Sequence, residues 1–528
     1  MTDRRWKRFL LLALGGILTG LTLIFPKAGF LEWLTLVPAG IFLLSEVCEP
    51  HTRLRGTYGY GFFFFMCYYI VVFHWFVYLY PLDFISGMTP AAAMAVVLAG
   101  SVGLSALQAA GGGLMFLAVR LLSRTTLMTR YKILRPFLIA GIWSVYEWTQ
   151  TVGWWGVPWG RLPLGQAEYL VGLQTASLLG PYFITFLLVA VNLCVAHAIL
   201  YRKSVRLMAV CACVILVFNY GAGTALYFFN VDGETTVNMA AIQGNIDSNE
   251  KWTAESRRRT LEVYEEYTLK AAEEGADIVV WPETSLPYTV TEENGFGEYC
   301  SELARRAGVT ILVGAFTDGE EGQYNSIVCV LPDGSFHDTV YAKQRLVPFG
   351  EFVPMRGLVT LLMPPLANLS MLAEDVLAGE GASVIACGDV NIGCLICFDS
   401  IYEELTRSSV LDGAQVICLS TNDSWFSDSA ALYMHNAQAQ MRAIESGRYV
   451  VRAANTGVST VIDAKGKVLC QLEPLVDGMV SQAVALNTHS TLYSLIGNAF
   501  VYVWIIALAA ISVMNIAVKK RALKNNIF

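Results

Sequence analysis

The sequence predicts a membrane-embedded bundle of about eight helices that carries a soluble α/β domain, and three observations lead to this prediction. Hydrophobic residues make up 55% of the 528 residues, charged residues only 15%, and the mean hydropathy is +0.49. Soluble domains rarely contain so few charges. Seven apolar runs long enough to cross a bilayer precede a more polar block at 231–490, and one run follows it. Within that block, short β-branched runs alternate with helical stretches.

The first apolar run follows a basic N-terminus, as a secretory signal peptide would. The run is long, lacks a small-residue cleavage site, and is followed at once by another run, so we expect a retained first helix. The predicted spans are 9–25, 29–47, 59–80, 91–119, 133–151, 168–200, 207–229 and 494–517. The corresponding domains are a transmembrane domain at 1–230, a soluble domain at 231–490 and a last span with its tail at 491–528.

The basic residues of the apolar part lie in alternate loops. They are Arg4, Arg5, Lys7 and Arg8, then Arg53 and Arg55, then Arg120, Arg124, Arg130, Lys132 and Arg135, then Arg202, Lys203 and Arg206, and finally Lys519, Lys520, Arg521 and Lys524. Alternate loops fall on one side of the membrane, and loops rich in Lys and Arg stay in the cytoplasm. Both termini are therefore predicted to be cytoplasmic and the soluble domain to lie outside.

Other features of the composition limit the function. The net charge of −7 is unevenly placed, because most Asp and Glu lie in the soluble block, and nothing indicates a nucleic-acid partner. The 12 cysteines lack the spacing of a disulfide framework. The Trp-rich loop 153–160 falls on the outer side, where tryptophans favour the interface. Simple anchoring is its favoured interpretation, and a floor under the active site is the alternative.

The soluble block is predicted to be a layered α/β sandwich, because its strands alternate with helices and hairpins. The predicted strands are Val237–Gln243, Ile278–Trp281, Thr310–Ala315, Ser326–Leu331, Val390–Cys397, Val416–Ser420 and Ser459–Asp463. The predicted helices are Thr253–Glu274, Glu298–Arg306, Glu403–Asp412 and Leu432–Ser446. Polar motifs follow several strands, and active sites of α/β folds usually lie at strand ends.

Three of these motifs carry candidate catalytic groups. Glu283 follows a buried strand, Lys343 stands alone in a segment punctuated by Pro and Gly, and Cys397 ends an apolar strand. Each has an ordinary structural interpretation: a cap or salt bridge for the glutamate, a solvated lysine, and a core cysteine. Together they supply a base, an oxyanion stabiliser and a nucleophile, the set that acyl transfer needs.

Cys394 and Cys397 also form a Cys-x-x-Cys pair, which is typical of redox and zinc sites. Residues three apart on a strand point to opposite faces, and the sequence has no second pair and no histidine nearby. Acyl transfer by Cys397 is therefore favoured over redox or metal chemistry, and no cofactor or metal is predicted.

At these residues the chain resembles the carbon–nitrogen hydrolase (nitrilase) superfamily, which uses a Glu-Lys-Cys triad in an αββα sandwich. With its membrane spans it resembles, within that superfamily, the apolipoprotein N-acyltransferases. The matching stretches are Trp281-Pro-Glu283, Lys343, Cys397, Gln243–Ile246, Tyr324–Ser326, Leu346–Pro354, Asn422–Phe426, Arg452–Gly457 and Pro158-Trp159. They extend over nearly the whole chain.

The resemblance implies a reaction in two steps at the bacterial inner membrane, with the catalytic domain in the periplasm. A membrane phospholipid gives an acyl chain to Cys397 as a thioester, and the α-amine of a diacylglyceryl-cysteine apolipoprotein then takes it. Glu283 is the implied base and Lys343 the implied oxyanion partner. The implied supporting residues are Glu351, Phe398, Asp399, Asn325, Trp252 and Trp425. The family usually has Tyr-Glu after its cysteine, and this chain has Phe398-Asp399.

The sequence leaves two other classes of protein as alternatives. A membrane-tethered nitrilase-type amidase would pass the thioester to water, and a transporter or scaffold would carry a degenerate domain. The complete triad argues against a scaffold, and spans with few interior charges argue against ion-coupled transport. The apolar segment 352–371 favours the transferase: it is too short and Pro-broken to span the bilayer, and we expect a lid that touches the membrane.

Overall fold

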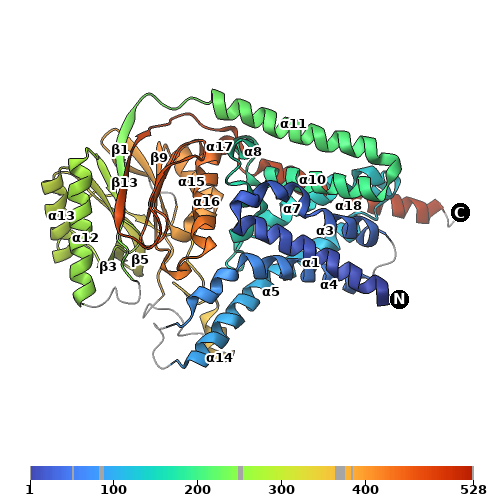
Figure 1. The fold of residues 1–528 in the computed structure, drawn as a ribbon, viewed down its shortest axis with the longest axis horizontal. Helices are drawn as coiled ribbons and strands as arrows, with labels where there is room; N and C mark the ends of the chain where they lie inside the picture. Colours follow the sequence, from blue (N-terminus) through green and yellow to red (C-terminus); the bar gives the residue numbers. More distant parts are fainter. Residues whose placement is uncertain are drawn as a thin grey trace. The chain divides into compact units, whose positions relative to one another are not determined.

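A computed structural model describes residues 2–49, 53–82, 88–247, 254–362, 375–381 and 384–525 (Figure 1). The chain divides into two units. We call Met1–Phe76, Leu98–Asn230 and Ile496–Phe528 the helical unit, and Val77–Val97 with Val231–Leu495 the α/β unit.

Long apolar helices make up the helical unit. The longer helices outside the sandwich are α1 (Thr2–Ile24), α4 (Leu54–Val72), α5 (Pro90–Leu122), α7 (Arg135–Thr149), α10 (Pro181–Leu200), α11 (Val205–Phe229) and α18 (Ala499–Asn525). The shorter ones are η1 (Pro26–Leu31), α2 (Glu32–Thr35), α3 (Val37–Phe42), η2 (Leu43–Val47), η3 (His74–Leu79), α6 (Thr126–Arg130), η4 (Lys132–Leu134), η5 (Pro158–Gly160), η6 (Leu162–Gln166), α8 (Leu170–Leu173), α9 (Ala176–Leu179), η7 (Arg202–Ser204) and α17 (Leu492–Ile496). Within the described ranges, six stretches are long and apolar enough to cross a membrane. They are Trp6–Ile24, Pro26–Val47, Pro90–Leu122, Pro181–Leu200, Arg202–Phe229 and Ala499–Arg521.

The two remaining predicted spans correspond to α4 and α7, which have 19 and 15 residues. At about 1.5 Å per residue, α7 rises only about 22 Å, less than the roughly 30 Å hydrocarbon layer. A total of eight spans therefore stays a prediction.

Glycine breaks two of the predicted spans. The run 168–200 contains α8, α9 and α10, and α9 ends before α10 because Gly180 adopts a φ of 80° and the next residue is Pro181. The run 494–517 is divided between α17 and α18 at Gly497, which has a φ of 57°. A helix cannot continue through a left-handed residue, and proline has no N–H to donate, so both breaks follow from local chemistry.

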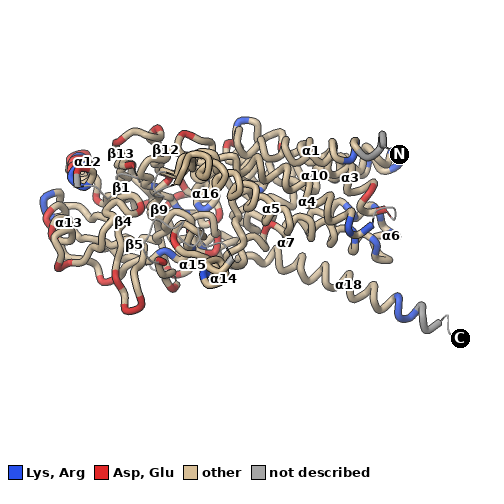
Figure 2. Tube along the Cα trace, turned by 90° about the horizontal axis from the view of Figure 1, so that it is seen from below, with Lys and Arg blue, Asp and Glu red and all other residues tan. Residues whose placement is uncertain are grey.

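Basic loops meet at one end of the helical unit. Lys132 and Arg135 pair with the Glu49 carboxylate at 2.9 and 2.8 Å, and Arg124 donates to the Glu49 carbonyl at 3.3 Å. Arg8 pairs at 2.8 Å with Glu46, which precedes Glu49 by three residues. Figure 2 shows Lys and Arg gathered at the end that holds α6 and the N-terminus. The N-terminal segment and the second and fourth loops therefore lie at the same end.

The Trp-rich loop of the helical unit has two kinds of tryptophan. Trp154 and Trp155 are exposed, whereas Trp159 is buried and lies 5.8 Å from the ring of Trp75. Exposure of the first pair favours interfacial anchoring, the simpler of the two interpretations of the sequence.

The α/β unit contains two mixed sheets. The strands are β1 (Thr236–Gln243), β2 (Ile278–Val280), β3 (Leu286–Thr289), β4 (Thr310–Gly319), β5 (Gly322–Val330), β6 (Tyr341–Ala342), β7 (Val384–Cys387), β8 (Val390–Ile396), β9 (Val416–Thr421), β10 (Tyr449–Ala454), β11 (Thr460–Ile462), β12 (Val468–Gln471) and β13 (Gly478–Ala485). One sheet has the order β13-β1-β2-β4-β5-β6, with β3 beside β4, and the other has the order β12-β11-β10-β9-β8-β7. The central pairs β1–β2, β2–β4, β8–β9 and β9–β10 are parallel.

The two sheets and the helices on their outer faces form four layers. Successive side chains of a strand point alternately to the core between the sheets and to the core under the helices. Met239 and Ala241 of β1 join Ile392 and Cys394 of β8 in one core between the sheets. Ala240, between the first two, joins a second core with the helices on the outer face. The sandwich helices are α12 (Ala254–Glu273), α13 (Gly295–Ala307), α15 (Glu403–Leu411) and α16 (Ala430–Ser446), and the short α14 (Arg356–Leu362) lies in the predicted lid segment. In Figure 1, α12 and α13 cover one outer face and α15 and α16 the other, which confirms the αββα sandwich.

Candidate active site

The candidate groups extend from the carboxyl ends of parallel strands. Glu283 follows β2 in one sheet, whereas Cys397 follows β8 and Asn422 follows β9 in the other. The Ser420 hydroxyl donates to the carbonyl of Trp281 at 2.8 Å, which ties β9 to the end of β2. Parallel strands that end together bring their following residues to one edge, where open α/β sheets bind ligands.

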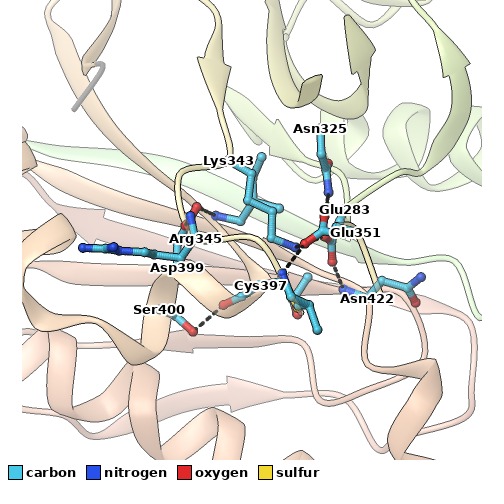
Figure 3. A network of polar contacts seen from close by, with 12 residues as sticks. Glu283, Asn325, Lys343, Arg345, Glu351, Cys397, Asp399, Ser400 and Asn422 are labelled. Atoms are coloured by element: carbon cyan, nitrogen blue, oxygen red, sulfur yellow. Dashed lines mark hydrogen bonds and ion pairs between the residues drawn. The ribbon is translucent and has the colours of Figure 1, made fainter. Parts of the chain in front are cut away.

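Glu283 and Lys343 form a buried ion pair at this edge (Figure 3). The Lys343 ammonium lies 2.7 Å from Glu283 Oε1, and its side chain is 1% exposed. The backbone N–H of Asn422 donates to Glu283 Oε2 at 2.9 Å. The carboxylate is therefore held in one orientation by partners from both sheets.

A second carboxylate completes the surroundings of the lysine. Glu351 Oε2 lies 2.9 Å from Lys343 Nζ and accepts from the N–H of Val347 at 2.9 Å. Burial on its own lowers the pKa of Lys343, but the carboxylates of Glu283 and Glu351 outweigh it and hold that pKa well above its usual value. Lys343 is therefore a fixed cation.

Asn325 of β5 joins the two carboxylates. Its side-chain Nδ2 donates to Glu283 Oε1 at 2.8 Å and to Glu351 Oε1 at 2.9 Å. Both hydrogens of the amide are thus used, and the amide supports a cluster of two anions and one cation. The structure brings Asn325 and Glu351, two of the predicted supporting residues, into direct contact with Glu283.

Cys397 occupies a strained turn. It begins the short helix η9 (Cys397–Ile401) directly after β8 and has a φ of 49°, a conformation that costs a residue with a Cβ energy. Burial, and then the charge of Glu283, raise the pKa of its thiol, whereas Lys343 lowers it. The resting thiol is therefore protonated and needs a base. Cys394 is fully buried in the core between the sheets, whereas Cys397 is partly buried and packs against that core.

Asp399 clamps the cysteine turn to the lysine segment. Its carboxylate accepts from the Tyr341 hydroxyl at 2.9 Å and from the N–H groups of Arg345 at 2.8 Å and Ile396 at 3.1 Å. Burial raises the pKa of Asp399 to about 6, against the opposing effect of Lys343. Phe398 stacks edge-on against Tyr402 at 5.6 Å. Asp399 therefore acts within the protein, and it orients two catalytic segments.

The other predicted residues are less central. Trp425 is half-buried in η10 (Ser424–Phe426), close in sequence to Asn422. Trp252 lies outside the described residues, as does 363–371 of the predicted lid. In the described part of that lid, Met355, Leu358 and Leu361 are exposed.

Sequence reasoning missed several residues of the site. Asn422, Asp423 and Arg452 belong to stretches that match the family, but no role is predicted for them, and His435 belongs to no such stretch. Arg452 Nη2 contacts Asp423 Oδ2 at 2.5 Å, and His435 Nδ1 contacts Asp423 Oδ1 at 2.9 Å. Asn422, Asp423 and Arg452 could have been found from the stretches 422–426 and 452–457. These stretches are rich in polar groups and lie after β9 and at the end of β10.

This arrangement is suited to acyl transfer. A thiol that is protonated at rest lies at the same edge as a carboxylate and a fixed cation. These groups can remove the proton, carry out the attack and stabilise an oxyanion.

Comparisons with known proteins identify relatives of both parts of the chain. The family model for carbon–nitrogen hydrolases matches residues 238–492, and the model for the N-terminal domain of apolipoprotein N-acyltransferases matches residues 15–194. An apolipoprotein N-acyltransferase of Gloeobacter violaceus is 31% identical over 93% of this chain and 91% of its own length. One of Vibrio cholerae is 31% identical over 69% of this chain and 72% of its own. A solved amidase of Nesterenkonia sp. is 17% identical, with a TM-score of 0.35, over 49% of this chain and 94% of the amidase.

Proposed function

This chain belongs to the apolipoprotein N-acyltransferase family, and from that premise we propose the residues, the donor and the membrane side of its reaction. The chain is an acyltransferase that N-acylates apolipoproteins. In our proposal Cys397 takes a fatty acyl chain from a membrane phospholipid as a thioester. It then passes the chain to the α-amine of the N-terminal diacylglyceryl-cysteine.

One observation carries the assignment of Cys397. Its turn has a φ of 49° directly after β8, and the turn is fixed by Asp399, which also holds the segment that carries Lys343. Strain of this kind persists only where the surrounding structure enforces it, and it occurs preferentially at functional sites. Cys394 lies in the core, so it does not offer an alternative nucleophile.

In the first half-reaction Glu283 removes the thiol proton and the sulfur attacks the ester carbonyl of the phospholipid. The C=O electrons move to oxygen, and the Lys343 ammonium stabilises this oxyanion. When the tetrahedral intermediate collapses, the ester C–O bond breaks. Glu283 returns the proton to the leaving alkoxide, so a lysophospholipid departs and the thioester remains.

In the second half-reaction the α-amine of the apolipoprotein attacks the thioester carbonyl. Glu283 accepts a proton from the amine, Lys343 again stabilises the oxyanion, and the C–S bond breaks. The thiolate recovers the proton from Glu283, and an amide has formed. No cofactor and no metal enter this scheme, which follows ping-pong kinetics.

We further propose a transmembrane domain at 1–230, a periplasmic catalytic domain at 231–490 and a final span with a cytoplasmic tail at 491–528. Support comes from the basic loops that share one end of the helical unit. A cysteine placed at exposed Glu320, in the turn between β4 and β5, tests the orientation. An impermeant maleimide should label it from the periplasm of cells with an intact inner membrane. Labelling only after that membrane is disrupted would place residue 320 in the cytoplasm and contradict the proposed orientation.

The amidase alternative differs in the acceptor, and a single reaction separates the two. Purified enzyme is incubated with a phospholipid that carries a labelled acyl chain, and with a diacylglyceryl-cysteine peptide whose α-amine is free. We expect the label on the peptide, and no transfer to the same peptide after N-acetylation. Release of labelled free fatty acid at the same rate with both peptides would favour hydrolysis and contradict the proposal.

A further inference from the structure

A buried histidine lies beneath the turn of Cys397. His435 of α16 is 1% exposed, and its Nδ1 lies 2.9 Å from Asp423 Oδ1. Its Nε2 lies 3.0 Å from the Ser400 hydroxyl oxygen and 3.3 Å from the carbonyl oxygen of Cys397. The sulfur of Cys397, a carboxylate oxygen of Asp423 and a ring nitrogen of His435 all lie within 4.8 Å of one another.

The hydrogen bonds around the ring constrain its protons. The Ser400 hydroxyl donates its one proton to the carbonyl of Cys397 at 2.7 Å, so its oxygen offers Nε2 a lone pair. Nε2 therefore faces two acceptors. Nδ1 faces the Asp423 carboxylate, whose pKa burial raises but Arg452 and His435 together hold below its usual range.

A neutral imidazole has one N–H and one lone pair, so either tautomer would leave a lone pair against an acceptor. The donor that the described contacts place near the ring is Arg452 Nη2, 3.2 Å from Nδ1, and it also donates to Asp423 Oδ2. The imidazolium form donates to Asp423 through Nδ1 and to Ser400 and Cys397 through Nε2. Arg452 Nη2 then donates to Asp423 Oδ2 and not to the ring. It is a second cation close to the nucleophile, on a different element from Lys343.

We propose that His435, held as an imidazolium by Asp423, is a positioning residue that fixes the Cys397 turn and favours the thiolate of Cys397. The inference rests on the proposed role of Cys397 as the nucleophile. The charge of Asp423 by itself raises the pKa of the Cys397 thiol. His435 as an imidazolium and the Arg452 guanidinium both contact that carboxylate, and their two positive charges outweigh its one negative charge. A positive surrounding is what a thiol needs where the carboxylate of Glu283 opposes its ionisation.

The remaining groups packed around the histidine support this role. Arg442 of α16 donates to the carbonyl of Ser400 at 3.1 Å and is paired with Glu445 at 2.7 Å. The Phe426 ring of η10 lies edge-on to the imidazole at 6.3 Å. The helix α16 thus holds η9 at two points: at Cys397 and Ser400 through His435, and at Ser400 through Arg442.

The same three residue types also bind zinc. However, Asp423 and His435 are hydrogen-bonded to each other through the atoms that would ligate, and the Arg452 cation contacts both. A metal ion would have to replace these contacts, so the geometry points to an internal ion pair.

The test is the pH dependence of Cys397 alkylation by iodoacetamide in the full-length, detergent-solubilised enzyme, read by peptide mass spectrometry. In His435→Gln we expect the midpoint to move up by about one pH unit, which slows alkylation roughly tenfold at any pH well below the midpoint. His489→Gln is the control, because His489 is exposed in the same unit, and its profile should match the wild type.

An unchanged profile in a folded His435→Gln enzyme would overturn the inference. So would protection of Cys397 by micromolar zinc that His435→Gln abolishes, because that result assigns a metal site. If the glutamine variant fails to fold, Ser400→Ala carries the test. Ser400→Ala keeps the imidazole but removes one of the two acceptors at Nε2. The pH midpoint of Cys397 alkylation should therefore move up by less than in His435→Gln. An unchanged midpoint would contradict the positioning role of His435.

These measurements need no phospholipid. A failure to find an acyl adduct on Cys397 would therefore refute the proposed nucleophile and leave the alkylation profiles readable, so the two failures can be told apart.

Discussion

Replacing Lys343 by methionine removes a buried cation while keeping most of the side-chain length. The ammonium lies 2.7 Å from Glu283 and 2.9 Å from Glu351, whose side chains are only 8% and 12% exposed. Without it, two carboxylates joined by Asn325 lose their counter-ion. Breaking a buried ion pair by removing one partner typically costs about 3–5 kcal/mol. We therefore expect a melting temperature lower by roughly 6–20 °C, at about 2–4 °C per kcal/mol.

The same substitution should slow thioester formation by about a hundred- to a thousandfold, the usual effect of removing one oxyanion stabiliser. The double variant Lys343→Met/Glu351→Gln separates the two effects. It removes one of the unpaired carboxylates, so it should recover part of the lost melting temperature but none of the lost rate.

Thermal unfolding followed by tryptophan fluorescence, and thioester formation followed by intact-protein mass spectrometry, check both expectations. Lys467→Met, at an exposed lysine of the same unit, is the control and should change the free energy of unfolding by less than about 0.5 kcal/mol. The reasoning fails if Lys343→Met melts like the wild type, or if the double variant regains thioester formation.

Three further predictions concern the base, the clamp and the lid. Glu283→Gln should slow thioester formation about a hundred- to ten-thousandfold. It should also speed iodoacetamide alkylation of Cys397 at a fixed neutral pH, because the carboxylate that raises the thiol pKa is gone; a loss of both would indicate a structural role instead. The pKa of Asp399, about 6, lies above its unfolded value, so the stability linked to its protonation is present at pH 4 and lost as the pH rises through 6. Chemical denaturation should therefore show the wild type losing free energy of unfolding relative to Asp399→Asn between pH 4 and pH 7, and a constant difference would contradict the burial argument. Leu358→Ser/Leu361→Ser should weaken use of vesicle phospholipid but spare a short soluble thioester donor, with Leu411→Ser as an exposed control, whereas equal loss with both donors would make the segment part of the fold.

The sequence predicted the sandwich well because its central strands are apolar, β-branched and bounded by polar motifs. All seven predicted strands and all four predicted helices of the soluble block are present within a few residues of their predicted ends. The sequence analysis did not predict the described strands β3, β6, β7, β10, β12 and β13. The inner strand β10 was missed because its sequence includes Arg452, which is fully buried against Asp423 rather than exposed. A buried arginine with a partner far along the chain leaves no periodic signal.

The site was predictable residue by residue but not as a network. Single-motif reasoning identified Glu283, Lys343 and Cys397, because each stands in a short and unusual segment. It did not find His435, which lies in the middle of α16 and has its partners 12 and 35 residues away in sequence. It also treated the shorter side chain of Asp399 as a departure from the family, whereas that carboxylate accepts from both the lysine segment and the cysteine turn.

The most direct test of the central claim is to locate the acyl group on the enzyme. Purified protein is incubated with phospholipid in the absence of an acceptor, digested, and examined by mass spectrometry for a fatty acyl adduct that hydroxylamine removes. We predict the adduct on the peptide that contains Cys397, its absence in Cys397→Ala, and its persistence in Cys394→Ala. An adduct on another residue, or one that survives in Cys397→Ala, would contradict the account.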